Sequence, residues 1–168
     1  MLYLVDANAI IHAKDQYFAI DQVPEYWAWL IHQGEAGRIK IPPEIFEEIS
    51  PGRDKNDPFY LWRKDKRTAS ALVLDEDVDP ARVQHVLAKG YAPDLDDNET
   101  EQIGADPFLV AYALVDAAGR TVVTTEVSKP SRTRANRHLP DVCRDLGVTA
   151  INTFQMNRAL NWRTNWMP

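Results

Sequence analysis

Residues 2–8 read Leu2-Tyr3-Leu4-Val5-Asp6-Ala7-Asn8. The first four are apolar and rich in β-formers, which is typical of a short strand buried on both faces of a sheet. We expect this strand to end at Asp6. Apolar residues at Ile10, Ile11, Ala13 and Tyr17 then predict a helix directly after it. A buried strand followed by a helix is the beginning of a βαβ unit.

The same alternation of strand and helix continues along the chain. Further strands are predicted at residues 38–41, 121–125 and 148–151, with helices between them that begin or end at Pro or Gly. Residues 72–74 fit either a strand or an apolar helix segment. The fold class is therefore α/β: a three-layer α/β/α sandwich with a central, mainly parallel sheet of four to five strands.

Composition indicates one ordinary globular domain over residues 1–168. The chain is 45% hydrophobic and 26% charged, and its longest apolar stretch, residues 108–115, is far shorter than the roughly 20 residues of a membrane-spanning helix. We therefore expect no membrane association. The first residues have no basic segment and no cleavage site typical of an export signal, so a cytoplasmic location is expected.

Cysteine, histidine and net charge exclude other classes. The one cysteine excludes an internal disulfide and a multi-cysteine zinc site, and the four histidines lack the spacing of metal ligands. A net charge of −6 argues against a protein that coats DNA, although local basic patches remain compatible with it.

Acidic residues follow the predicted strands at the edge where parallel sheets bind ligands. Asp6 follows the first strand and Glu126 follows the late one. Glu47 and Glu48 follow the second strand on a short helix. One of these two must point toward the sheet edge, because Ile45 and Ile49, on either side of them, are expected to face the core; we favour Glu48, with Glu47 as the alternative.

Asp106 has two interpretations. It precedes Pro107 and an apolar helix, so it fits the N-cap of that helix. A carboxylate at this position can also face a cation. Together with Asp6, Glu48 and Glu126 it would make a cluster of four carboxylates, which repel one another unless cations neutralise them. Ligation by oxygen alone selects Mg²⁺ or Mn²⁺, and the matching chemistry is hydrolysis of a phosphodiester.

These residues resemble the PIN-domain family, the small metal-dependent ribonucleases common among bacterial toxins. The resemblance spans almost the whole chain. The sequence is similar in particular to a PIN subgroup of uncharacterised proteins. The resemblance is carried by residues 4–8, 41–49, 105–113, 122–126 and 139–143.

The resemblance implies an Mg²⁺- or Mn²⁺-dependent endoribonuclease, the toxin of a type II toxin–antitoxin pair. In this interpretation Asp6, Glu48 and Asp106 hold metal, a fourth acid at Glu126 contributes, and Asn8 and Thr124 are accessory polar residues. Glu126 is one methylene longer than the aspartate that is most common at the fourth position. RNA would be the substrate, a cognate antitoxin and a second copy of the chain would be partners, and residues 52–97 would form a helical insertion.

Two basic stretches are candidates for contacts with RNA phosphates. The loop after Glu126 carries Lys129, Arg132, Arg134 and Arg137, close to the predicted metal site. The helix with Arg63, Lys64, Lys66 and Arg67 fits better as a solvated face. The alternative to an enzyme is a catalytically silent PIN-like module that binds RNA or protein.

Overall fold

Four parallel strands form one sheet in the computed structural model, which describes residues 1–167. The strands are β1 (Leu2–Val5), β2 (Ile39–Lys40), β3 (Arg120–Val123) and β4 (Thr149–Ile151), in the spatial order β2-β1-β3-β4. In the register, Leu4 lies opposite Lys40 on one side and Val122 on the other. The last two residues of β1 and of β3 are fully buried, which confirms the buried parallel sheet predicted from their apolar sequences.

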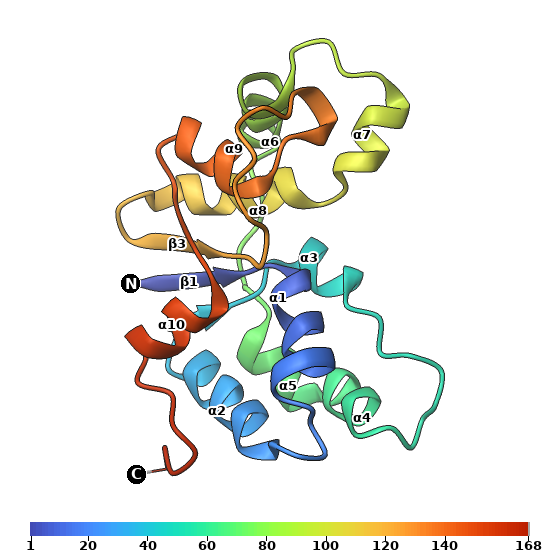
Figure 1. Cartoon of the computed structure of the whole chain (residues 1–168), viewed down its shortest axis with the longest axis vertical. Coiled ribbons are helices and arrows are strands. Elements are labelled where there is room, and N and C mark those ends of the chain that lie inside the picture. Colours follow the sequence, from blue (N-terminus) through green and yellow to red (C-terminus); the bar gives the residue numbers. More distant parts are fainter. Residues whose placement is uncertain (168) are drawn as a thin grey trace.

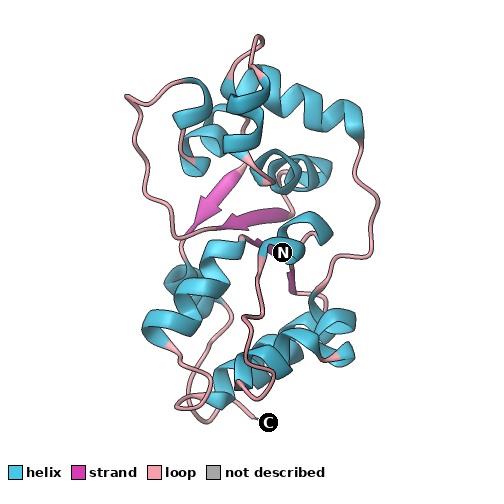
Figure 2. Ribbon diagram, turned by 90° about the vertical axis from the view of Figure 1, so that its right-hand side faces the viewer, coloured by secondary structure: helices cyan, strands magenta, loops and turns pink. Residues whose placement is uncertain are grey.

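Helices cover both faces of this sheet (Figures 1 and 2). One layer contains α1 (Ala7–His12) with the π-helical turn η1 (Ala13–Tyr17), α2 (Pro24–Glu35), α4 (Pro58–Lys64), α5 (Lys66–Leu72) and α10 (Thr153–Ala159). The other contains α6 (Pro80–Val86), η2 (Leu87–Tyr91), α7 (Asp97–Ile103), α8 (Asp106–Ala113), η3 (Leu114–Asp116), η4 (Arg134–Asn136) and α9 (Leu139–Asp145). The short helix α3 (Pro43–Glu48) lies beside α1. The predicted three-layer sandwich is confirmed.

Local hydrogen bonds explain where two predicted elements differ from the structure. The single helix expected to carry Arg63, Lys64, Lys66 and Arg67 is two helices, because the Asp65 carboxylate accepts the Arg67 N–H at 2.8 Å and starts α5 there. Residues 72–74 are neither a full strand nor a continuous helix: α5 ends at Leu72, and Val73 makes one isolated parallel bridge to Ile41. The sheet in the described part of the chain therefore has four strands rather than five.

Residues 52–97 contribute to both layers. Helix α5 packs against α2, whereas α6 packs against α8 on the opposite face. Between these helices, Glu76 accepts a hydrogen bond from the Tyr112 hydroxyl through its main-chain carbonyl and pairs with Arg120 at 2.8 Å through its carboxylate. The segment predicted as an insertion is thus packed into the body of the fold.

The chain order makes an opening at the carboxyl ends of β1 and β3. From β1 the chain crosses to β2 on one side and later returns to β3 on the other, and such a reversal leaves a crevice in an open parallel sheet. Asp6 follows β1, and Thr124 and Glu126 follow β3, so all three residues lie at this crevice. Within residues 1–167, no helix combines the length and apolar character needed to cross a membrane.

Candidate active site

Asp6 is a buried carboxylate at the end of β1. Its backbone is extended and caps α1, where Oδ1 accepts the Asn8 N–H at 3.4 Å. Its Oδ2 accepts the Thr124 hydroxyl at 2.8 Å, and only 2% of the residue is exposed. Burial, with a smaller contribution from the charges of Glu126 and Glu48, raises the pKa of Asp6 to about 6 despite these two hydrogen bonds.

Asp106 does not cap its helix, so that part of the prediction is wrong. The N-cap of α8 is Ala105, which makes no side-chain hydrogen bond, and Asp106 is the first helical residue. Its Oδ2 accepts a hydrogen bond from the Tyr91 hydroxyl at 3.5 Å. The pKa of Asp106 lies well above its usual range, first because of burial and then because of the charges of Asp6, Glu126 and Glu48. The carboxylate therefore faces the other acids rather than its own helix end.

Of the two candidate glutamates on α3, Glu48 lies at the cluster. Its Oε1 accepts the Ala105 N–H at 3.1 Å, immediately before Asp106. The preceding Gly104 has φ +64°, which favours glycine, and a Cβ there would lie 3.2 Å from the same oxygen and press on the Glu48 carboxylate. Glu47 instead pairs with Arg63 at 3.5 Å and has an 82% exposed side chain.

Arg63 is a buried residue that the sequence interpretation placed on a solvated face. Its Nε donates to the Ile49 carbonyl at 3.1 Å, and its terminal nitrogen donates to the Phe46 carbonyl at 2.8 Å. The guanidinium also lies 3.6 Å from the centre of the Phe46 ring. These contacts fix the last turn of α3, and with it Glu48. Arg63 and Arg67 are four residues apart, the spacing of one helical face. Nothing in the sequence around Arg63 indicates that it contacts Phe46 and Ile49 at the end of a different helix.

Glu126 is fixed to the beginning of α9. Its Oε2 accepts the Leu139 N–H at 2.7 Å and lies 3.6 Å from His138 Nδ1. Its backbone N–H donates to the Thr124 hydroxyl oxygen at 3.2 Å, so Thr124 connects Glu126 with Asp6. The charge of Glu126 contributes to the raised pKa of both aspartates.

The cluster therefore concentrates negative charge with little compensation. Across residues 1–167, no lysine or arginine pairs with Asp6, Glu48, Asp106 or Glu126. In the same residues, no three acidic, histidine or cysteine side chains are gathered closely enough, as they stand, to hold one metal ion. Each glutamate has one oxygen bonded to a backbone N–H and one oxygen without such a bond.

The remaining predicted residues divide by their surroundings. Thr124 is buried at the cluster, whereas the Asn8 side chain is exposed and only its backbone N–H reaches Asp6. In the basic loop, Arg134 pairs with Glu99 and Asp94, both at 2.7 Å.

Arg137 is likewise engaged, since it pairs with Asp145 and donates to the Gly90 carbonyl. Lys129 and Arg132 are exposed and have no acidic partner within the described chain. The loop thus offers two free cations rather than four.

Comparison with known proteins gives one family. No curated protein and no solved structure matches the chain. A family model described as "Domain of unknown function (DUF4411)" matches residues 3–164, which include every acid of the cluster. The chain is therefore a member of the DUF4411 family.

Proposed function

We propose that this protein is a PIN-like endoribonuclease that depends on Mg²⁺ or Mn²⁺ and hydrolyses phosphodiester bonds. The observation that carries the proposal is the pair Asp6 and Asp106: burial and two nearby glutamates raise the pKa of both, and no basic side chain in residues 1–167 pairs with either. Perturbed acids collected in a crevice are typical of functional sites. A divalent cation would neutralise the charge that the protein itself leaves unpaired.

The donor set fits this kind of ion. All four side chains offer carboxylate oxygens, which Mg²⁺ and Mn²⁺ prefer over nitrogen or sulfur ligands. Asp6 and Asp106 would hold the ion most directly, and Glu48 and Glu126 would each use the oxygen that is not bonded to a backbone N–H. Such an ion supplies a water molecule of lowered pKa and positive charge beside the phosphate oxygens.

Other residues of the chain would hold these acids in place. The Thr124 hydroxyl orients Asp6, and the Tyr91 hydroxyl donates to Asp106. Arg63 holds α3, which carries Glu48. Lys129 and Arg132 extend from the loop after Glu126, where they can contact RNA phosphates.

The biological setting belongs to the same proposal. From the PIN resemblance we infer a cytoplasmic toxin that forms a homodimer and is silenced by a cognate antitoxin. The second candidate is a catalytically silent module that binds RNA or protein; it is favoured by the spacing of the side chains in residues 1–167, where no three acidic, histidine or cysteine groups are close enough, as they stand, to hold one ion. Metal binding distinguishes the two.

The test is thermal melting of the wild-type protein and Asp106→Asn during titration with Mn²⁺, together with cleavage of a mixed pool of single-stranded RNA. Glu101→Gln is the matched control, since Glu101 is an exposed acid on α7. The wild type and the control should gain Tm with Mn²⁺ and cut RNA, while Asp106→Asn should do neither. A ligand at 100 times its Kd adds about 2.7 kcal/mol, which melting resolves. No Mn²⁺ effect on any of the three proteins would contradict the enzyme and favour the silent module.

A further inference from the structure

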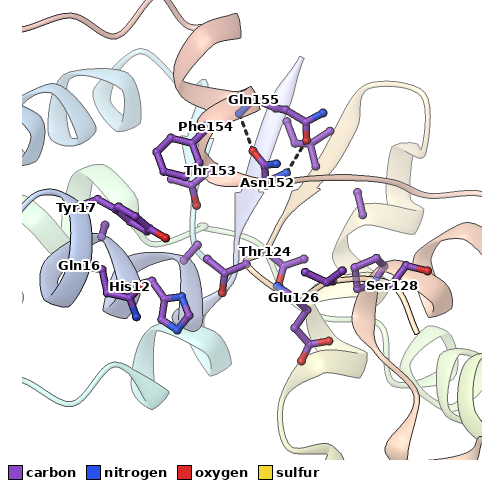
Figure 3. A pocket seen from close by; sticks show the side chains of 17 residues that line it. His12, Gln16, Tyr17, Thr124, Glu126, Ser128, Asn152, Thr153, Phe154 and Gln155 are labelled. Atoms are coloured by element: carbon purple, nitrogen blue, oxygen red, sulfur yellow. Dashed lines mark hydrogen bonds between the residues drawn. The ribbon is translucent and has the colours of Figure 1, made fainter. Parts of the chain in front are cut away.

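A cleft of about 550 Å³ opens beside the acidic cluster (Figure 3). It lies between η1, the beginning of α10 and the loop that follows β3. Thr124 and Glu126 belong to its lining, and the Thr124 hydroxyl also donates to Asp6. The cleft is therefore continuous with the candidate active site, and its size is typical of a site for a small organic group.

Two exposed aromatic rings form one side of this cleft. Tyr17 of η1 and Phe154 of α10 meet edge to face, with ring centroids 5.0 Å apart. They are 49% and 48% exposed, whereas the other aromatic residues of the described chain are buried or half-buried. Rings left open in this way beside a cleft offer flat surfaces on which a planar ligand can stack.

The cleft also contains a polar group whose hydrogen bond is missing. Thr153 is only 6% exposed, and its hydroxyl has no partner among the described residues. Figure 3 shows this hydroxyl and the Tyr17 side chain pointing into the cleft. A buried hydroxyl without a partner is unfavourable, so a ligand group seated against it would supply the absent bond.

Further polar groups line the same wall. Asn152 and Gln155 form a capping box that uses their carboxamide oxygens, and their NH₂ groups remain as donors. No lysine or arginine lines the cleft, and Glu126 stands at its side toward the cluster. A phosphate would meet a negative carboxylate and no lysine or arginine here, whereas an uncharged ring with donors and acceptors on its edge finds both stacking surfaces and hydrogen-bond partners.

We propose that this cleft binds one nucleobase of an RNA strand whose backbone passes over the acidic cluster. The inference rests on the proposed ribonuclease function and names the part of the substrate that the protein holds beside the reacting phosphate. Tyr17 and Phe154 would stack on the base, and Thr153 and the Asn152 amide would contact its edge. The base in the cleft would fix the position of the adjacent phosphodiester relative to Asp6 and Glu126.

The experiment is a titration of the ¹⁵N-labelled full chain, in EDTA, with each of the four 5′-mononucleotides and with ribose 5-phosphate as the ligand without a base. Amide shifts at Tyr17 and at residues 153–155 should appear with nucleotides and not with ribose 5-phosphate. Phe154→Ala should weaken nucleotide binding about fivefold or more, since stacking on one ring is lost. Phe154→Trp should restore it, and Leu61→Ala, which removes an exposed apolar side chain on α4, should leave it unchanged.

Equal shifts with ribose 5-phosphate would overturn the base subsite in favour of a sugar or phosphate contact. Absence of shifts with all four nucleotides up to about 10 mM would also overturn it, because the Kd of a single nucleotide bound by these contacts should lie below this concentration. Cleavage of RNA in Mn²⁺ is measured in parallel. Cleavage without base binding refutes the subsite alone, whereas base binding without cleavage or a Mn²⁺ effect refutes the proposed enzyme alone.

Discussion

Asp6→Asn should make the metal-free protein more stable at neutral pH and should abolish the proposed ribonuclease activity. The Asp6 carboxyl is 2% exposed, and burial raises its pKa from 3.8 to about 6. A group whose pKa is raised by folding contributes stability below its unfolded pKa, and this stability is lost as the pH rises through the folded pKa. The wild type should therefore lose stability between about pH 4 and pH 6 through this one residue.

The size of the effect follows from the same shift. One pKa unit corresponds to about 1.4 kcal/mol, so a rise from 3.8 to about 6 costs about 3 kcal/mol above pH 6. Asparagine removes this charge and keeps both hydrogen bonds, because its oxygen can accept the Asn8 N–H and its NH₂ can donate to the Thr124 hydroxyl oxygen. For a chain of this length, about 2–4 °C per kcal/mol predicts a gain in Tm of about 6–12 °C.

The assay is melting in EDTA over a range of pH, followed by titration with Mn²⁺. In EDTA the two proteins should melt alike near pH 4 and separate as the pH rises, with Asp6→Asn the more stable. Mn²⁺ should then raise the Tm of the wild type and leave the variant unchanged. Asp141→Asn is the matched control with the opposite sign.

Asp141 is also 2% exposed, yet its surroundings compensate its charge. Burial alone would raise its pKa, but hydrogen bonds from Ser128, the Lys129 N–H and Arg144 lower it. Asp141→Asn should therefore lower the Tm at neutral pH. If Asp6→Asn also melted below the wild type in EDTA at neutral pH, an ionised and uncompensated Asp6 would be refuted.

The remaining predictions concern the residues that support the site and its proposed contacts with RNA. Arg63→Met should lower the free energy of unfolding by about 2–4 kcal/mol in urea denaturation, because it leaves two main-chain carbonyls at the end of α3 without a donor. The control is Arg67→Met, on the exposed side of the neighbouring helix, which should leave the denaturation midpoint almost unchanged. Equal losses of stability in both variants would contradict the role of Arg63. Lys129→Ala combined with Arg132→Ala should weaken RNA binding and reduce the slope of log K against log salt by about 1.4, the value for two phosphates of a single strand. An unchanged slope in fluorescence anisotropy would remove this loop from the interface.

The parallel sheet and the order of the acids could be predicted from the sequence because both depend on local pattern. Short apolar runs alternate with helical segments, and the carboxyl ends of parallel strands share one edge, so Asp6 and Glu126 had to lie at the same crevice. The kind of metal ion could also be predicted, because four carboxylate donors without cysteine or suitably spaced histidine favour Mg²⁺ or Mn²⁺.

Long-range contacts decided what local pattern left open. Glu47 and Glu48 are adjacent and chemically identical. Only tertiary contacts distinguish them: Arg63, from another helix, donates to the end of α3, and the Ala105 N–H donates to Glu48. Asp106 looked like a helix cap because Pro107 follows it, yet the helix begins one residue earlier.

The basic loop and the cleft show the same division. The sequence by itself determined that the loop after Glu126 is basic, but it could not indicate that Glu99 and Asp94 neutralise Arg134, since these partners lie far away along the chain. Tyr17 and Phe154 likewise meet only after α10 folds back onto η1. A side chain's direction and its partner depend on the packing of whole elements, and therefore only the tertiary structure decides which residues of a matching pattern reach the site.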